Sequence, residues 1–290
     1  GTVSGNGGFT SQILADGRVI AASDASINGL TIGRGAGNSV YNTTLGSSAL
    51  ANNTTGTSNI AAGLWALYTN TTGSHNTACG MEALYYNTTA SGNTAFGSGT
   101  LYVNTTGPEN SAFGYRSLHS NTTGYANTGI GYLCLYSNTT GHSNLATGVQ
   151  ALYNNLTGIN NVAVGLSALK ANTTGGYNTS VGSNSLENNT TGAQNSAFGR
   201  SALHSNTTGN YNVACGYATM HDNTAGSSNT ATGYQALYKN TASDNTANGF
   251  YALINNTTGS SNTAVGMNAM LSNTNGEDGV AVGRNSLYSN

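Results

Sequence analysis

The chain has 290 residues, of which 6% are charged, and its formal net charge is −2. Seven basic residues are too few to form the lysine and arginine clusters that displace counterions from nucleic acid, which excludes nucleic-acid binding. No apolar run reaches the roughly 20 residues of a membrane span. Disordered chains combine low hydrophobicity with high net charge and few aromatic residues, whereas this chain carries 17 tyrosines, so we expect an ordered protein.

Residues 1–29 fall outside any repeat. Because the end of a stacked repeat array has to be covered, we predict that residues 1–29 form an N-terminal cap or a junction to an upstream segment. Residues 30–290 then make up the repeat array.

A glycine recurs through the array and anchors a 17-residue unit, N-T-A-Z-G-x-x-A-L-Y-x-N-T-T-G-x-x, in which Z is apolar. We call the glycine that follows Z the anchor glycine. The anchor glycines are Gly46, Gly63, Gly80, Gly97, Gly114, Gly131, Gly148, Gly165, Gly182, Gly199, Gly216, Gly233, Gly249, Gly266 and Gly283. One unit lacks a residue within residues 240–244, which predicts a loop there, because loops tolerate deletions.

Seventeen residues are too few for a two-helix repeat, and they carry no 3.6-residue apolar pattern. The segment N-T-A-Z-G alternates as a strand does, and A-L-Y-x-N is a candidate for a second strand. The segment N-T-T-G reads as a turn whose glycine is free to adopt positive φ. We therefore predict an all-β fold, a parallel β-solenoid (β-roll) of about 15 coils.

The seventh residue after the anchor glycine is asparagine in every unit, from Asn53 to Asn290. Stacked coils place these side chains above one another, so each amide can bond to the amides on either side, as in other stacked β arrays. The N-T-T triplets look like N-glycosylation acceptors. A glycan on an asparagine of this ladder would break it, so we expect no glycosylation there.

Three further columns are apolar or aromatic. The first is the residue before the anchor glycine, which we call the pre-glycine column. The second is the Leu or Met four residues after that glycine, and the third is the residue five after it, which is often Tyr and which we call the Tyr column. A thin coil encloses one large side chain and its alanines, so another such column stays exposed along the array and predicts an interface. Chains that each expose one apolar edge associate most simply with cyclic symmetry, which favours a trimer of parallel chains. In the pre-glycine column, Thr147, Thr232 and Asn248 either fix the register as polar layers or are tolerated near a solvated edge.

The unit at Asn262–Gly266, followed by Ala269, resembles the N-S-x-A-I-G…S-x-A repeat of trimeric autotransporter adhesin heads. The longer form A-L-Y-S-N-T-T-G-x-x-N-T-A resembles repeats of phage tail fibres and related bacterial fibre proteins. The resemblance covers about residues 30–290 and implies a left-handed parallel β-roll that forms a homotrimer. The 17-residue period differs from the shorter period of adhesin heads.

Catalytic chemistry has little support in the sequence. Glycan hydrolysis needs two carboxylates at a defined separation, and Glu277 and Asp278, the only adjacent pair, lie on a predicted turn. His204 and His221 share one column beside Asp222 but have no third close ligand, so we predict no metal site. We expect no enzyme and no cofactor.

Other polar and sulfur-containing residues receive structural roles. Lys170 and Glu187 occupy neighbouring units in the same column, which predicts a surface ion pair. Cys79, Cys134 and Cys215 lack metal or redox spacing, and we expect all three to be small buried hydrophobes.

The column five residues after the anchor glycine is the best candidate for ligand binding, since regularly spaced rings beside Asn and Thr suit sugars. The candidate residues are Tyr68, Tyr85, Tyr102, Tyr136, Tyr153 and Tyr238. The alternative is that these rings pack along the array or between chains.

Together these features predict a structural or adhesive segment of a tail-fibre-like or trimeric-adhesin-like protein. Such a segment would be extracellular, on a cell surface or in a virion fibre, and would space or present receptor binding to a cell-surface glycan. One alternative is an ice- or surface-binding solenoid, although Leu145, Val162, Val213 and Val280 interrupt its threonine column. A glycan-cleaving tail-spike enzyme has less support.

Overall fold

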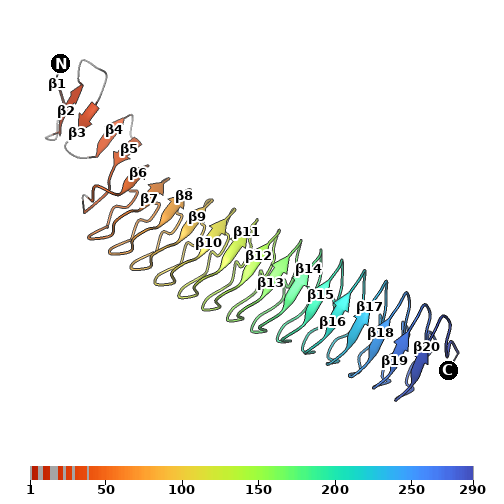
Figure 1. Ribbon diagram of the computed structural model, residues 1–290. Coiled ribbons are helices and arrows are strands. Elements are labelled where there is room, and N and C mark those ends of the chain that lie inside the picture. Colours follow the sequence, from red (N-terminus) through yellow and green to blue (C-terminus); the bar gives the residue numbers. More distant parts are fainter. Residues whose placement is uncertain are drawn as a thin grey trace. The chain divides into compact units, whose positions relative to one another are not determined.

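The computed structural model describes residues 2–5, 9–13, 19–21, 24–27, 30–37 and 39–289. These residues form strands and turns and no helix, which confirms the all-β prediction. The chain divides into two compact units, Gly1–Thr123 and Gly124–Asn290. The first unit runs from red to yellow in Figure 1, and the second from green to blue.

The first unit opens with antiparallel strands. Strand β2 (Phe9–Ile13) pairs with both β1 (Thr2–Gly5) and β3 (Val19–Ala21). Strands β4 (Ala25–Ile27) and β5 (Leu30–Gly33) also pair with each other, and β5 continues antiparallel onto β6 (Thr43–Leu45). The edge of the first repeat strand is thereby paired. The predicted cap at residues 1–29 lies partly outside the described residues and stays a prediction.

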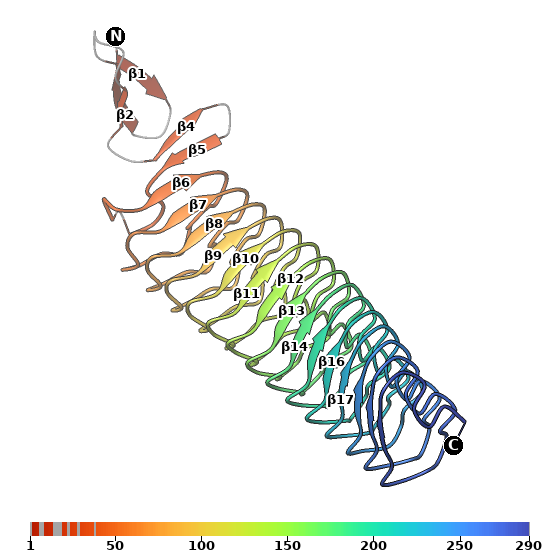
Figure 2. The ribbon, with the colours of Figure 1, turned by 45° about the vertical axis from the view of Figure 1, so that its right-hand side comes forward.

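The rest of the first unit is a stack of parallel strands in strict register (Figure 2). These strands are β6, β7 (Ile60–Ala62), β8 (Thr77–Cys79), β9 (Thr94–Phe96) and β10 (Ser111–Phe113). Each residue pairs with the one 17 positions later, as Ile60 does with Thr77. One sequence unit therefore makes one coil of a parallel β-solenoid.

The second unit repeats this arrangement. Its strands are β11 (Thr128–Ile130), β12 (Leu145–Thr147), β13 (Val162–Val164), β14 (Thr179–Val181), β15 (Ser196–Phe198), β16 (Val213–Cys215), β17 (Thr230–Thr232), β18 (Thr246–Asn248), β19 (Thr263–Val265) and β20 (Val280–Val282). From β17 to β18 the register step falls to 16, because the missing residue is taken from the turn. The chain contains about 14 turns, close to the predicted number.

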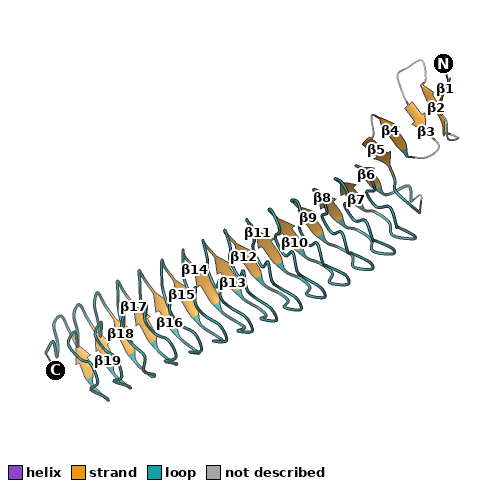
Figure 3. Cartoon of the chain, turned by 180° about the vertical axis from the view of Figure 1, so that it is seen from behind, coloured by secondary structure: helices purple, strands orange, loops and turns teal. Residues whose placement is uncertain are grey.

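Each coil contains one strand rather than the two we expected (Figure 3). The segment A-L-Y-x-N is a turn, because the Leu and the residue two before it lie in the left-handed region; Trp65 and Leu67 have φ of 58° and 52°. Its backbone still bonds to the next coil, as the Leu67 N–H does to the Ala83 carbonyl at 3.0 Å. The second-strand prediction was wrong because alternate left-handed residues bend a chain that would otherwise extend.

Two glycine columns serve different purposes. The anchor glycine Gly63 has φ of 137°, which an L side chain rarely adopts, and a Cβ there would lie 2.5 Å from the Gly80 carbonyl oxygen. The glycine of N-T-T-G does not have the positive φ that we predicted. A Cβ at Gly73 would instead approach the Ala90 carbonyl oxygen of the next coil closely, although Ala90 itself shows that the fold can accommodate alanine at this repeat position.

The core of each coil is thin, as the sequence predicts. In one coil Ala61, Ala66 and Leu67 are fully buried. The middle residue of each three-residue strand points inward and its neighbours point outward, as the burial of Thr94, Ala95 and Phe96 shows. One large side chain and two alanines therefore make up the apolar interior of a coil.

Two asparagine columns complete the interior. The predicted ladder is confirmed within each unit: Asn70 Nδ2 donates to Asn53 Oδ1 at 2.9 Å and to the Gly73 carbonyl at 3.0 Å, and the pattern repeats along Asn53–Asn121 and Asn138–Asn273. A second ladder, which we did not predict, uses the Asn that begins N-T-A-Z-G. The Asn59 N–H donates to Asn42 Oδ1 at 2.9 Å. Both columns are buried, so the laddered asparagines are closed to glycosylation in the folded chain.

Candidate functional site

The Tyr column of the first unit is a continuous stack of rings. Tyr85 lies between Tyr68 and Tyr102, with ring centroids 5.2 and 5.4 Å away, and His119 continues the stack 5.1 Å beyond Tyr102. Burial, followed by the charge of Arg116, lowers the pKa of His119.

In the second unit the same column contains two shorter stacks. Tyr136 and Tyr153 stack at 5.2 Å. Lys170 and Glu187 then occupy the column, and the rings resume with His204, His221 and Tyr238, at 4.8 and 4.9 Å.

This geometry decides how the predicted binding residues can act. A sugar stacks on a free ring face, but the faces of Tyr85 are covered by its neighbours, and Tyr136 and Tyr153 cover one face of each other. The column therefore offers ring edges along most of its length. The packing role that we gave as the alternative accounts for these contacts.

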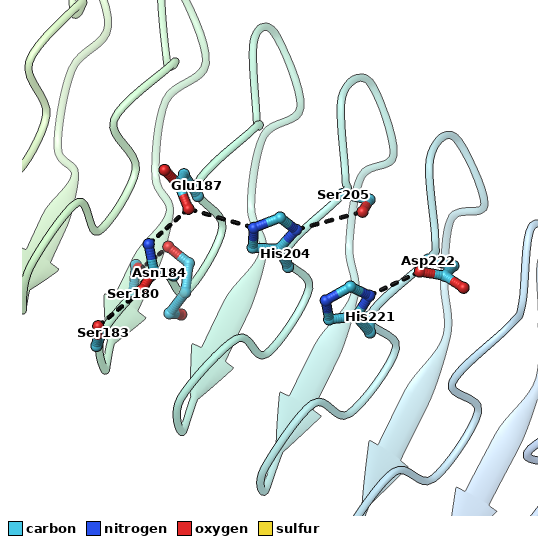
Figure 4. Close-up of polar contacts among 9 residues, drawn as sticks. Ser180, Ser183, Asn184, Glu187, His204, Ser205, His221 and Asp222 are labelled. Atoms are coloured by element: carbon cyan, nitrogen blue, oxygen red, sulfur yellow. Dashed lines mark hydrogen bonds and ion pairs between the residues drawn. The ribbon is translucent and has the colours of Figure 1, made fainter.

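A polar cluster interrupts the Tyr column of the second unit (Figure 4). Glu187 Oε2 lies 3.2 Å from His204 Nε2 and accepts a hydrogen bond from Asn184 Nδ2 at 2.6 Å. His221 Nδ1 lies 2.6 Å from Asp222 Oδ1. Glu187, His204 and His221 come from three successive coils, so the period of the fold brings them together.

The cluster corrects one prediction. Glu187 pairs with His204, and no ion pair joins it to Lys170 within the described part of the chain. The imidazole of His204 reaches Glu187 directly, and Asn184 holds the carboxylate from its own coil. Among residues 24–27, 30–37 and 39–289, no three His, Cys, Asp or Glu side chains gather as a metal site would require.

An aromatic cluster that we did not predict lies beside the Tyr column in the first unit. Trp65 meets Tyr85 at 6.4 Å with the two rings nearly perpendicular. Tyr86 packs edge-on against Tyr85 and Tyr102, at 4.7 and 5.2 Å. The sequence signal was present, since Trp65 is the only tryptophan of the chain, but the left-handed turn that brings it to the Tyr column was not predicted.

The outward face of the strands carries an exposed apolar column. It consists of the residues before the anchor glycines, and its large exposed members are Leu45, Phe96 and Phe113 in the first unit and Ile130, Val181, Phe198, Val265 and Val282 in the second. Phe96 and Phe113 stack on each other at 5.5 Å. The two cysteines of this column, Cys79 and Cys215, are half-buried and exposed, so of the three cysteines only Cys134 is buried as predicted.

Comparisons with protein families, curated proteins and solved structures return no match. Within the described residues, no helix has the length and apolarity needed to cross a bilayer.

Proposed function

We propose that this chain is a segment of an extracellular fibre of the tail-fibre or trimeric-adhesin type. Three parallel copies associate along their strand faces, and the assembly spaces or presents receptor binding to a cell-surface glycan. The sequence resemblance to adhesin-head and tail-fibre repeats supports this class.

The observation that carries the proposal is the exposed apolar column on the outward strand face. Phe198 is 43% exposed in the single chain, Val181 on the coil before it is also exposed, and exposed apolar side chains return in this column at Val265 and Val282. No charged residue occurs in the pre-glycine column, so a second copy meets no unpaired charge when it packs there. Monomers rarely expose an apolar surface that continues over many coils.

A second copy of the same chain is the partner that fits this column best. Neighbouring coils repeat the same side-chain position at the spacing of paired strands, and only another array of equal period keeps that register over many coils. Cyclic symmetry closes such a contact without leaving a free edge. Thr232 and Asn248 on successive coils then place polar groups within the interface.

The test is the mass of the full chain in solution. Sedimentation equilibrium should give three times the 29.2 kDa chain mass. Replacing Phe198 and Val181 by Asp should dissociate the trimer, because desolvating a buried unpaired carboxylate costs several kcal/mol.

Tyr177→Asp is the matched control, since Tyr177 is 57% exposed and precedes strand β14 without belonging to it or to the pre-glycine column. It should leave the mass unchanged. A wild-type chain that sediments as a monomer at all concentrations would overturn the proposal.

A further inference from the structure

The aromatic cluster of the first unit has features that packing alone does not explain. It comprises Trp65, Tyr68, Tyr85, Tyr86 and Tyr102, which we call the aromatic platform. Tyr68, Tyr85 and Tyr102 form the stacked support, and Tyr85 also contacts both remaining rings. Each ring is therefore held by at least one other ring, which fixes the arrangement before any ligand arrives.

Two rings of the platform remain open to solvent. Trp65 is 39% exposed and Tyr86 is 43% exposed. Trp65 lies at 88° to Tyr85, and Tyr86 lies at 72° to Tyr85 and 81° to Tyr102, so neither ring is stacked face to face. Unlike the central rings of the Tyr column, these two side chains keep ring surface that a ligand can cover.

A carboxylate lies next to the platform. Glu82 occupies the same repeat position as Trp65 on the following coil, and in the described part of the chain no ion pair or side-chain hydrogen bond engages it. Burial, and after it the neighbouring hydroxyl groups and the Glu82 charge, raise the pKa of Tyr85 and Tyr102. Glu82 is thus an available hydrogen-bond acceptor one coil beyond Trp65 and near the stacked rings of Tyr85 and Tyr102.

We propose that the aromatic platform binds a neutral pyranose unit of a glycan. The C–H face of the sugar packs on Trp65 and Tyr86, and Glu82 accepts a hydrogen bond from a ring hydroxyl. Trp and Tyr rings combine a broad apolar face with a polar tip, which suits a sugar that is apolar on its C–H face and polar at its hydroxyl groups. This inference deepens the glycan presentation proposed above, and it does not depend on the trimer.

Other ligands fit the platform less well. A second copy of the chain would use a surface that continues along the coils, whereas the platform spans three coils. On the coils that follow Trp65 and Tyr86, Glu82 and Val103 stand at their repeat positions. Nucleic acid needs cations, and the charged member here is acidic. A quaternary ammonium ion needs a box of separated rings, but Tyr85 and Tyr86 are in direct contact at 4.7 Å.

The single tryptophan makes the test direct, because intrinsic tryptophan fluorescence of the full chain reports on Trp65 alone. We would titrate the protein with cellohexaose, chitohexaose, mannohexaose, maltohexaose, hexagalacturonate and choline chloride. A saturable change in emission with at least one neutral hexasaccharide is the expected result. The proposal would be overturned if none of the neutral hexasaccharides changes the emission. A response confined to hexagalacturonate or to choline would overturn it in the same way.

Variants locate the site. By calorimetry, Trp65→Ala should weaken binding of the responding hexasaccharide about tenfold or more, which corresponds to one anchoring ring. Tyr86→Ala and Glu82→Gln should each weaken it severalfold. Tyr177→Ala removes an exposed tyrosine outside the platform and should have no effect.

Circular dichroism and sedimentation of each variant separate lost binding from lost folding or assembly. Unchanged affinity in folded Trp65→Ala and Glu82→Gln would place the sugar elsewhere and overturn the assignment. A trimer that binds no sugar contradicts the platform alone, and a monomer that binds sugar through Trp65 contradicts the trimer alone.

Discussion

Left-handed residues recur in every coil, and most of them are not glycine. In one coil Gln150, Leu152 and Asn160 have φ of 57°, 51° and 54°. This conformation costs an ordinary L residue roughly 1–2 kcal/mol. The cost is offset where the residue gains burial, as Leu152 does by becoming fully buried, because burying a leucine side chain contributes about 2 kcal/mol.

The anchor glycines should be the least replaceable residues of the array. Gly165 has φ of 138°, and a Cβ would lie 2.5 Å from the Gly182 carbonyl oxygen. We expect Gly165→Ala to lower the free energy of unfolding by about 2–3 kcal/mol. Gly176→Ala is the control, since no positive φ occurs there and Ala193 occupies the same repeat position on the next coil, although the added Cβ would lie 3.1 Å from the Ile159 carbonyl oxygen. Chemical denaturation that ranks the two variants equally would contradict this explanation.

Cys134 should make stability depend on pH. Burial raises the pKa of its thiol from 9.0 to about 11. The unfolded chain loses this proton first, so the stabilisation is complete below pH 9.0 and declines as pH rises toward 11. Between these limits the free energy of unfolding of the wild type should fall by roughly 1–2 kcal/mol more than that of Cys134→Ala, as measured by urea denaturation. Parallel pH profiles of the two proteins would rule out the buried thiol as the cause.

At the scale of the coil, the amide ladders join neighbouring coils through buried side chains. Asn189 donates to Asn172 Oδ1 and to the Gly192 carbonyl, and it accepts from Asn206 Nδ2 at 2.7 Å. Each side chain therefore bonds on both sides, and removal of one leaves unsatisfied groups on two coils. Buried polar groups without a partner cost about 1–3 kcal/mol each.

Asn189→Ala should accordingly destabilise the second unit by roughly 2–4 kcal/mol. The adjacent Asn188 is exposed, and its side chain makes no hydrogen bond within the described residues, so Asn188→Ala should change stability by less than about 0.5 kcal/mol. Thermal unfolding followed by circular dichroism distinguishes the two. A small effect at both positions would mean that the asparagine ladder forms only as a consequence of the coil geometry and does not stabilise the coil.

The sequence predicts whatever depends on period and burial alone. A position that recurs every 17 residues must stack on itself, so the ladder at Asn189 and the thin core around Leu152 follow without knowledge of the path between strands. The turn at Trp65 and Leu67 does not follow, because its left-handed φ values are unusual for those residue types. The aromatic platform depends on that turn and was missed. The period places both Lys170 and His204 next to Glu187 in one column, but it does not decide which of the two Glu187 contacts.

At the scale of the whole molecule, two of the exposed apolar and aromatic surfaces differ in how they recur along the array. The pre-glycine column of Phe198 recurs through both units and suits a partner of the same period. The platform around Trp65 is confined to three coils of the first unit. This division separates assembly from recognition, so a change in either surface should leave the other intact.

The short unit at residues 240–244 has a consequence for how such chains vary. Although one residue is missing, Asn240 Nδ2 still donates to Asn223 Oδ1, and Asn240 Oδ1 accepts from Asn256 Nδ2, so the asparagine ladder continues through the short coil without a break. A gene encoding such units can gain or lose whole coils by unequal recombination, without a new interface having to arise. The length of the array is therefore a heritable variable that selection can adjust independently of the fold.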